Sequence, residues 1–178
     1  LAGPNLNAFT AIARALRGAG LSAPEVYAAD ASTGFAVIED LGDDLFARAI
    51  PAGADERDLY AAAIDALLAL HEAAPAAPAA PTYTMLTYDR TAMEAEVMLA
   101  PDWYWPHLKG ETASPDIRAD YLDAWNGVLA KLPAPSTMVL RDFHAENILW
   151  LPARSAYKRA GVIDFQDGLF GNPAYDLV

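Results

Sequence analysis

The sequence predicts an α+β fold in which a strand-rich portion precedes a mostly helical portion that contains a polar hairpin. Runs rich in β-branched and aromatic residues predict strands, and apolar residues at helical spacing predict helices. The predicted strands occupy residues 25–30, 35–39, 138–140, 148–151 and 161–163, and the predicted helices lie at residues 5–18, 55–71, 93–99 and 114–132. An Ala-Pro run at residues 73–81 is expected to be an extended connector, because proline interrupts helices.

Composition limits the classes of function. The 178 residues, 54% of them hydrophobic, can bury one sizeable core or two small lobes. The net charge of −12 argues against a nucleic-acid partner, and is compatible with a cytoplasmic enzyme or a cationic substrate. The absence of Cys excludes disulfides and thiolate metal sites. No apolar run approaches the roughly 20 residues of a membrane helix, so we expect no membrane partner. Nothing in the sequence indicates an oligomeric state.

The first helix is expected to begin at a capping Asn5 or Asn7 and to end at Gly18 or Gly20. The two glycines and Ala23 match a dinucleotide-binding fingerprint, G-x-G-x-x-A. That fingerprint follows a strand and opens a helix, whereas this one follows a helix. A helix C-cap is therefore the favoured interpretation.

The most informative stretch places Asp142 and Asn147 on one loop and Asp164 on the next arm of a hairpin. Phosphoryl transfer requires a divalent ion near an anionic triphosphate and a carboxylate that orients the attacking hydroxyl. Mg²⁺ takes hard oxygen ligands, usually one or two of them from protein. Asn147 and Asp164 are the expected metal ligands, and Asp142 is the expected acceptor of the hydroxyl proton.

These residues carry a family resemblance. Residues 140–150 (Leu-Arg-Asp-Phe-His-Ala-Glu-Asn-Ile-Leu-Trp) and 162–167 (Val-Ile-Asp-Phe-Gln-Asp) resemble the catalytic loop and metal motif of the protein-kinase-like fold. Residues 162–167 and 171–177 are more similar to the metal segment of the aminoglycoside-phosphotransferase-like small-molecule kinases. Residues 140–150 most resemble one branch of that family, the anomeric kinases of N-acetylmuramate and N-acetylglucosamine. Two departures are Leu140, where the fold usually has His, and Gln166, where protein kinases have Gly.

The resemblance implies a bilobal architecture with residues 1–41 as a partial N-lobe and residues 42–178 as a C-lobe. The hinge would lie at residues 39–42, where the backbone of Glu39, Asp40 and Leu41 would hold the adenine of ATP. Taken alone, these residues favour a polar strand end followed by a turn. Their spacing ahead of the catalytic loop reverses this preference and favours the hinge.

Further roles follow from the same resemblance. His144 would contact the transferred phosphoryl group, or make only a structural hydrogen bond within the loop. Asp176 would brace the backbone of the catalytic loop. Glu96 and Asp102 match acidic positions of the amino-sugar branch, and Trp103 offers a flat ring to a sugar. The alternatives for these three are solvation and ordinary packing.

The expected function is an ATP- and Mg²⁺-dependent kinase for the anomeric hydroxyl of an amino sugar in cell-wall recycling. The alternatives are a kinase for an aminoglycoside, choline or homoserine, and a non-catalytic kinase-like module. The chain begins at Leu1, and its first lysine is Lys109, so the phosphate-binding lysine and glycine-rich loop of the fold are missing. We therefore expect a portion of a longer protein that on its own transfers phosphate poorly or not at all.

Overall fold

The computed structural model describes residues 3–75, 79–80 and 83–177 and shows a mixture of helices and strands. The chain divides into two compact units, one formed by Leu1–Leu86 with Ser136–Val178 and the other by Thr87–Pro135. The segment before the expected hinge thus shares a unit with both polar loops, and a lobe boundary after Leu41 stays a prediction. Across the described ranges, no helix is both long and apolar enough to cross a membrane.

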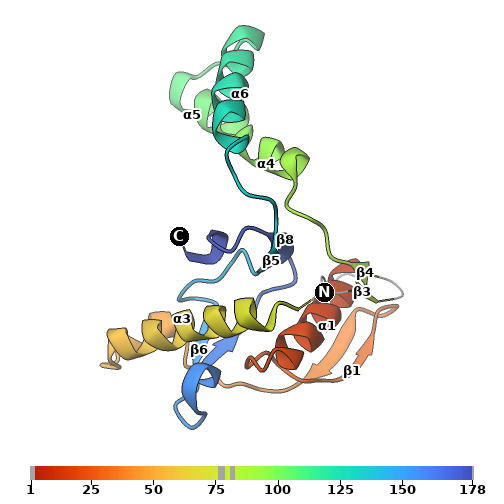
Figure 1. Ribbon diagram of the computed structural model, residues 1–178, viewed down its shortest axis with the longest axis vertical. Coiled ribbons are helices and arrows are strands. Elements are labelled where there is room, and N and C mark those ends of the chain that lie inside the picture. Colours follow the sequence, from red (N-terminus) through yellow and green to blue (C-terminus); the bar gives the residue numbers. More distant parts are fainter. Residues whose placement is uncertain (1–2, 76–78, 81–82, 178) are drawn as a thin grey trace. The chain divides into compact units, whose positions relative to one another are not determined.

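In the larger unit, α1 (Gly3–Gly18) precedes an antiparallel hairpin of β1 (Val26–Asp30) and β2 (Phe35–Ile38) (Figure 1). The two strands confirm the predicted ones. The predicted cap of α1 is wrong, because Asn5 and Asn7 lie inside the helix. The helix starts before them, at Gly3, where a proline at the next position suits a first helical turn.

The end of α1 is a helix C-cap, as predicted. The Gly20 N–H donates to the Arg17 carbonyl at 2.9 Å, and the Leu21 N–H donates to the Leu16 carbonyl at 3.0 Å, which is the Schellman pattern. Gly20 has φ +88°, and a Cβ there would lie 2.7 Å from the Tyr157 hydroxyl oxygen. The left-handed φ favours glycine at this position, and the helix C-cap accounts for Gly20.

Two helices follow the hairpin: α2 (Phe46–Ala49) and α3 (Glu56–Ala73). The Asp55 side chain caps α3 by accepting from the Asp58 N–H at 3.0 Å. The apolar residues at helical spacing that predict α3 do not all face the core, because three of the large ones are exposed while several alanines are buried. The exposed residues are Tyr60, Ile64 and Leu68, and the buried alanines are Ala62, Ala63 and Ala66. Small side chains on that face allow the helix to approach the core closely.

Three further strand pairs are antiparallel. These are β3 (Ala79–Ala80) with β4 (Tyr83–Thr84), β5 (Thr137–Val139) with β8 (Leu169–Gly171), and β6 (Ile148–Trp150) with β7 (Ala160–Val162). The short 3-10 helices η2 (Ala156–Arg159) and η3 (Tyr175–Leu177) flank them. Of the expected connector at residues 73–81, residues 76–78 and 81 lie outside the described part of the chain, and β3 occupies two of the others.

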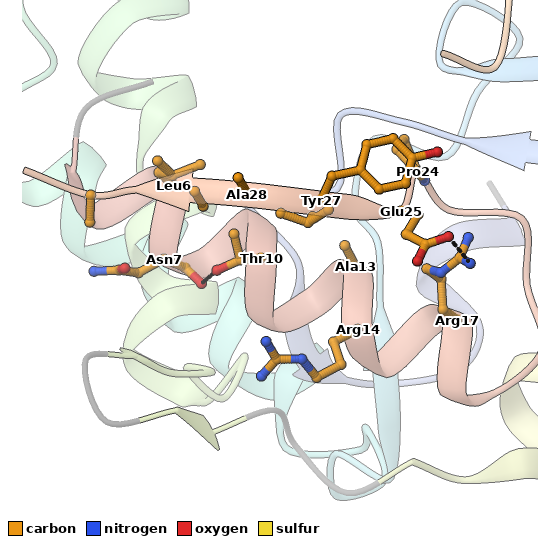
Figure 2. Close-up of a pocket in the computed structure, with 13 residues that line it drawn as sticks. Leu6, Asn7, Thr10, Ala13, Arg14, Arg17, Pro24, Glu25, Tyr27 and Ala28 are labelled. Carbon is orange, nitrogen blue, oxygen red and sulfur yellow. Dashed lines mark hydrogen bonds and ion pairs between the residues drawn. The ribbon is translucent and has the colours of Figure 1, made fainter. Parts of the chain in front are cut away.

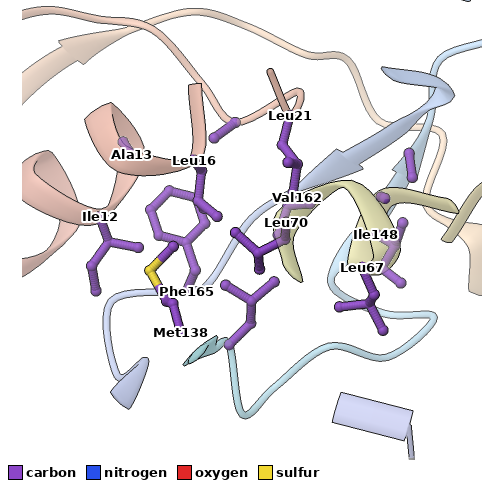
Figure 3. Packing of buried hydrophobic residues seen from close by; sticks show 14 of the residues in the cluster. Ile12, Ala13, Leu16, Leu21, Leu67, Leu70, Met138, Ile148, Val162 and Phe165 are labelled. Atoms are coloured by element: carbon purple, nitrogen blue, oxygen red, sulfur yellow. The ribbon is translucent and has the colours of Figure 1, made fainter. Parts of the chain in front are cut away.

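The core of this unit joins α1 and α3 to the strands that carry the polar loops (Figure 3). Its members include Ile12, Leu16, Leu67, Leu70, Met138, Ile148, Val162 and Phe165. Phe165, directly after Asp164, stacks on Phe9 of α1 with ring centroids 5.0 Å apart. Leu140 is 1% exposed, so the residue that replaces the usual His is an ordinary core side chain. Both polar loops therefore emerge from the same buried layer.

The smaller unit is helical and contains α4 (Arg90–Val97), the π-helix η1 (Ala100–Tyr104), α5 (Trp105–Lys109) and α6 (Pro115–Leu129). Ser114 caps α6 by accepting from the Ile117 N–H at 3.3 Å, and Pro115 follows it, as predicted. The helical spacing of Ile117, Tyr121, Leu122, Trp125 and Val128 in the sequence predicts that they form the buried side of this helix, and this prediction is wrong. Among the described residues of α6 Leu129 alone is buried, because so short a unit has little chain with which to cover its helices.

Candidate active site

The loop between β5 and β6 carries Asp142, His144 and Asn147, and backbone hydrogen bonds close it into a compact turn. The His144 N–H donates to the Asp142 carbonyl at 3.1 Å, and the Asn147 N–H donates to the His144 carbonyl at 2.8 Å. The Asn147 side-chain nitrogen Nδ2 also donates to the Asp142 carbonyl, at 3.0 Å. Asp142 itself is exposed, so its carboxylate is accessible to a substrate hydroxyl.

This arrangement orients the amide of Asn147. Because Nδ2 is committed to the Asp142 carbonyl, the remaining oxygen Oδ1 is the atom that can serve a hard cation. His144 lies within the same turn, with Nε2 3.3 Å from Asn147 Nδ2 and with Nδ1 3.3 Å from the Glu146 backbone nitrogen. A neutral imidazole can accept at only one of these nitrogens. The contacts fit the structural alternative for His144, and its contact with a phosphoryl group stays a prediction.

Asp164 lies beside Asn147 at one end of the β6–β7 hairpin. Ile148 pairs with Val162 in the strand register, and the Ile163 N–H donates to the Asn147 carbonyl at 3.1 Å. Asp164 follows immediately in a left-handed conformation with φ +58°. L-residues adopt this conformation at a cost of about 1–3 kcal/mol and do so preferentially at functional sites.

A second strained residue precedes the predicted base. Arg141 has φ +69°, and its N–H donates to Asp176 Oδ1 at 2.9 Å, while the Leu140 N–H donates to Asp176 Oδ2 at 2.7 Å. Burial raises the pKa of Asp176 above its ordinary value of 3.8, and the two N–H donors lower it in part. These two hydrogen bonds are the contact that the predicted brace requires, since they fix the backbone directly before Asp142.

A cavity of about 310 Å³ brings the expected hinge to the same hairpin. Its lining residues are Pro24, Ile38, Glu39, Asp40, Leu41, Gly42, Leu149 and Ile163. Leu149 lies two residues after Asn147, and Ile163 directly precedes Asp164. The backbone of residues 39–42 forms one wall of the cavity, and the apolar side chains of Leu149 and Ile163 form another. The candidate metal ligands are close in sequence to these two apolar residues. The sequence did not identify the apolar wall, although its residues lie on the strands that flank the motifs.

A larger cavity of about 540 Å³ lies between α1 and β1 (Figure 2). Arg14, Arg17, Glu25 and Tyr27 contribute to its wall, and Arg17 forms an ion pair with Glu25 at 3.0 Å. Among the described residues that line it there is no predicted catalytic or metal residue. The smaller cavity is therefore the better candidate for the active site, because its lining residues Leu149 and Ile163 lie close in sequence to Asn147 and Asp164.

The donor set fits a magnesium site that also needs a phosphate ligand. The described residues contain no group of three or more His, Cys, Asp or Glu that could hold a metal ion. One amide oxygen, from Asn147, and one carboxylate, from Asp164, are a small set. Mg²⁺ often keeps only one or two protein ligands and completes its shell with phosphates and waters.

The predicted substrate residues lie in the smaller unit, Thr87–Pro135. Glu96 accepts a hydrogen bond from the Tyr88 hydroxyl, and Asp102 forms an ion pair with Arg118. Trp103 is 74% exposed. Their role in binding a sugar stays a prediction.

Comparison with known proteins assigns the chain to a class. Residues 3–178 match the family described as "Phosphotransferase enzyme family", and the chain belongs to this family. It is 44% identical to the N-acetylmuramate/N-acetylglucosamine kinase of Caulobacter vibrioides over 99% of this chain and 50% of that protein. It is 30% identical to the kinase of the same name from Pseudomonas aeruginosa, over 95% of this chain and 47% of that protein. The chain spans about half the length of these relatives.

A solved structure shows the same fold. The ternary complex of streptomycin, ATP and APH(2")-IIa matches 97% of this chain and 58% of that chain with a TM-score of 0.57 at 19% identity. The predicted resemblance to aminoglycoside-phosphotransferase-like kinases is confirmed, as is the mixed helix and strand content. The bilobal arrangement stays a prediction.

Proposed function

We propose that the protein containing this chain transfers the γ-phosphoryl group of ATP to a hydroxyl of an amino sugar. The observation that supports this proposal is that Leu149 and Ile163 line the 310 Å³ cavity. Leu149 lies two residues after Asn147, and Ile163 directly precedes Asp164. The names of the related kinases support N-acetylmuramate or N-acetylglucosamine as the acceptor.

The cavity suits the base of the nucleotide. Leu149 and Ile163 offer an apolar surface to adenine, and the backbone of residues 39–41 offers hydrogen-bonding groups. The triphosphate then extends toward Asn147 and Asp164. Those two residues would hold Mg²⁺, which neutralises phosphate charge when it is bound.

Asp142 is the proposed base. Its exposed carboxylate takes the proton of the acceptor hydroxyl as that oxygen forms a bond to the γ-phosphorus. The bond between the γ-phosphorus and the bridging oxygen breaks at the same time, and ADP leaves. The hydrogen bonds from the backbone of residues 140–141 to Asp176 hold this base in position.

We also propose that the protein acts in cell-wall recycling and is located in the cytoplasm, because both are expected of a kinase for these amino sugars. The alternative acceptors are an aminoglycoside, choline and homoserine, and we expect none of them to support ADP release. The neighbour with streptomycin is 19% identical and shows only the fold, so it does not favour an aminoglycoside.

The test measures ADP release by the intact protein with N-acetylmuramate, N-acetylglucosamine, an aminoglycoside, choline and homoserine. We expect turnover with an amino sugar and a loss of roughly 10²–10⁴-fold in Asp142→Asn, the usual contribution of a general base. Asp65→Asn, which removes an exposed carboxylate of α3, is the matched control and should retain activity. Absence of ADP release with every sugar would overturn the proposal, and an unchanged rate in Asp142→Asn would remove this residue from the mechanism.

A further inference from the structure

The side chain of Glu39, in the wall of the nucleotide cavity, is held by two arginines at once. Arg154 Nη2 lies 2.6 Å from Glu39 Oε1, and Arg17 Nη1 lies 3.2 Å from Glu39 Oε2. The Glu25 backbone N–H also donates to Glu39 Oε2, at 3.1 Å. The Glu39 side chain is 22% exposed, so this carboxylate is largely removed from solvent.

The partners come from three separate elements. Arg17 lies in the last turn of α1, Glu25 directly precedes β1, and Arg154 lies in the connection between β6 and β7. The Glu39 N–H donates to the Glu25 carbonyl at 2.7 Å. One residue at the exit of β2 is therefore tied to the N-terminal helix, to the neighbouring strand, and to the hairpin that carries the metal-ligand candidates.

The arginines are themselves fixed. Arg17 Nη1 donates to the Ala23 carbonyl at 3.1 Å, and its Nη2 pairs with Glu25 Oε2 at 3.0 Å. The Arg154 N–H donates to the Leu151 carbonyl at 3.0 Å. An isolated surface ion pair contributes little because two long side chains must be ordered for it. Here that cost is shared, since Arg17 also serves Glu25 and Glu39 serves both arginines.

We propose that Glu39 is a positioning residue whose side chain, held by Arg17 and Arg154, fixes the hinge backbone in the geometry that receives the nucleotide base. The inference rests on the proposed function and adds a role for three side chains that do not touch the reacting atoms. A hinge fixed before binding loses less freedom when the nucleotide arrives, so the network raises affinity without taking part in chemistry.

The experiment compares wild type with Glu39→Gln, Arg17→Met, Arg154→Met and Arg154→Lys in the intact protein. We expect the Kd for MgADP and the KM for ATP to rise about 3- to 10-fold in Glu39→Gln and both Met variants, which corresponds to loss of one or two partly exposed pairs. The kcat should stay within about twofold, because the reacting groups are untouched. Arg154→Lys should retain part of the affinity, since it keeps the charge but not the fork of donors.

Arg57→Met is the matched control for Arg17→Met and Arg154→Met, because Arg57 is exposed in the first turn of α3 and its loss changes the net charge by the same amount. Amide hydrogen exchange in the absence of nucleotide supplies an independent readout, and residues 38–42 should exchange faster in Glu39→Gln and Arg154→Met. Unchanged affinity for MgADP in both of these variants would overturn the inference. If wild type does not bind MgADP, the proposed function fails instead, and hydrogen exchange alone tests the role of the network. Faster exchange of residues 38–42 in the variants would then support the role of Glu39 and its arginines in fixing this backbone. Unchanged exchange would contradict that role.

Discussion

The two units of this chain differ in how firmly their candidate site residues are held by surrounding structure. In the larger unit, the loops with Asp142 and Asp164 are anchored by backbone hydrogen bonds and rise from a buried core. In the smaller unit, Asp102 is paired with a neighbouring helix and Trp103 is 74% exposed. The sequence spacing of candidate site residues is therefore strong evidence of function where backbone hydrogen bonds of the loop fix their positions. It is weak evidence where the side chains project from the surface of helices.

The largest effect should follow from loss of the Asp164 carboxylate, which we propose as a ligand of Mg²⁺. Asp164→Ala should lower turnover by about 10³-fold or more and remove its dependence on Mg²⁺, because Asn147 alone cannot hold the ion against the triphosphate. Steady-state rates over a Mg²⁺ titration measure this effect. Retained Mg²⁺ dependence in the variant would show that the ion binds elsewhere.

The next effect concerns the core beneath that loop. Phe165 is 1% exposed and stacked on Phe9, so Phe165→Ala should lower the free energy of unfolding by about 3–5 kcal/mol. Phe35→Ala is the control, because Phe35 is 76% exposed and its truncation should change stability by less than about 0.5 kcal/mol. Urea unfolding followed by circular dichroism measures both. Equal losses in the two variants would contradict the core described for the larger unit.

A smaller effect depends on pH and on the brace. Asp176→Asn leaves one of the two N–H donors without an acceptor, which should cost about 1–3 kcal/mol. Burial raises the pKa of Asp176, so the folded state holds this proton more tightly than the unfolded state. The free energy of unfolding of wild type should therefore fall, relative to the variant, as pH rises from 3.8 through the raised pKa, and then level off. A difference that is constant over this pH range would contradict the assigned environment.

The smallest effect tests the smaller unit. Trp103→Ala should raise the KM for the amino sugar by about 3- to 10-fold while the KM for ATP stays unchanged, if this ring contacts the sugar. Stability should change little, because the side chain is exposed. Initial rates at varied sugar and fixed ATP measure the change. An unaltered KM for the sugar would show that Trp103 does not contact the sugar, and would contradict the substrate role predicted for it.

Local signals in the sequence predicted much of this molecule. The strands at β1 and β2, the cap at Ser114, and the C-cap at Gly20 follow from turn and capping chemistry that neighbouring residues determine. The proximity of Asn147 and Asp164 followed from a short hairpin. In each case the residues that decide the outcome lie within about 20 positions of one another.

Contacts between distant residues could not be predicted. The ion pairs of Glu39 join residues 17, 39 and 154, and no pattern in one sequence links such positions. The exposed face of α3 was also missed, because Tyr60 and Leu68 share helical spacing with the buried residues and only the packing partners select the face. The start of α1 was misplaced because Asn5 is a preferred N-cap residue, whereas the helix already begins at Gly3.

A crystal structure of the intact protein with Mg²⁺ and a non-hydrolysable ATP analogue would show directly whether Asn147 and Asp164 bind the metal ion beside the nucleotide. We predict an ion about 2.0–2.1 Å from Asn147 Oδ1 and from a carboxylate oxygen of Asp164, with the base against Leu149 and Ile163. A nucleotide bound in the larger cavity between α1 and β1, or an ion that touches neither Asn147 nor Asp164, would contradict the account.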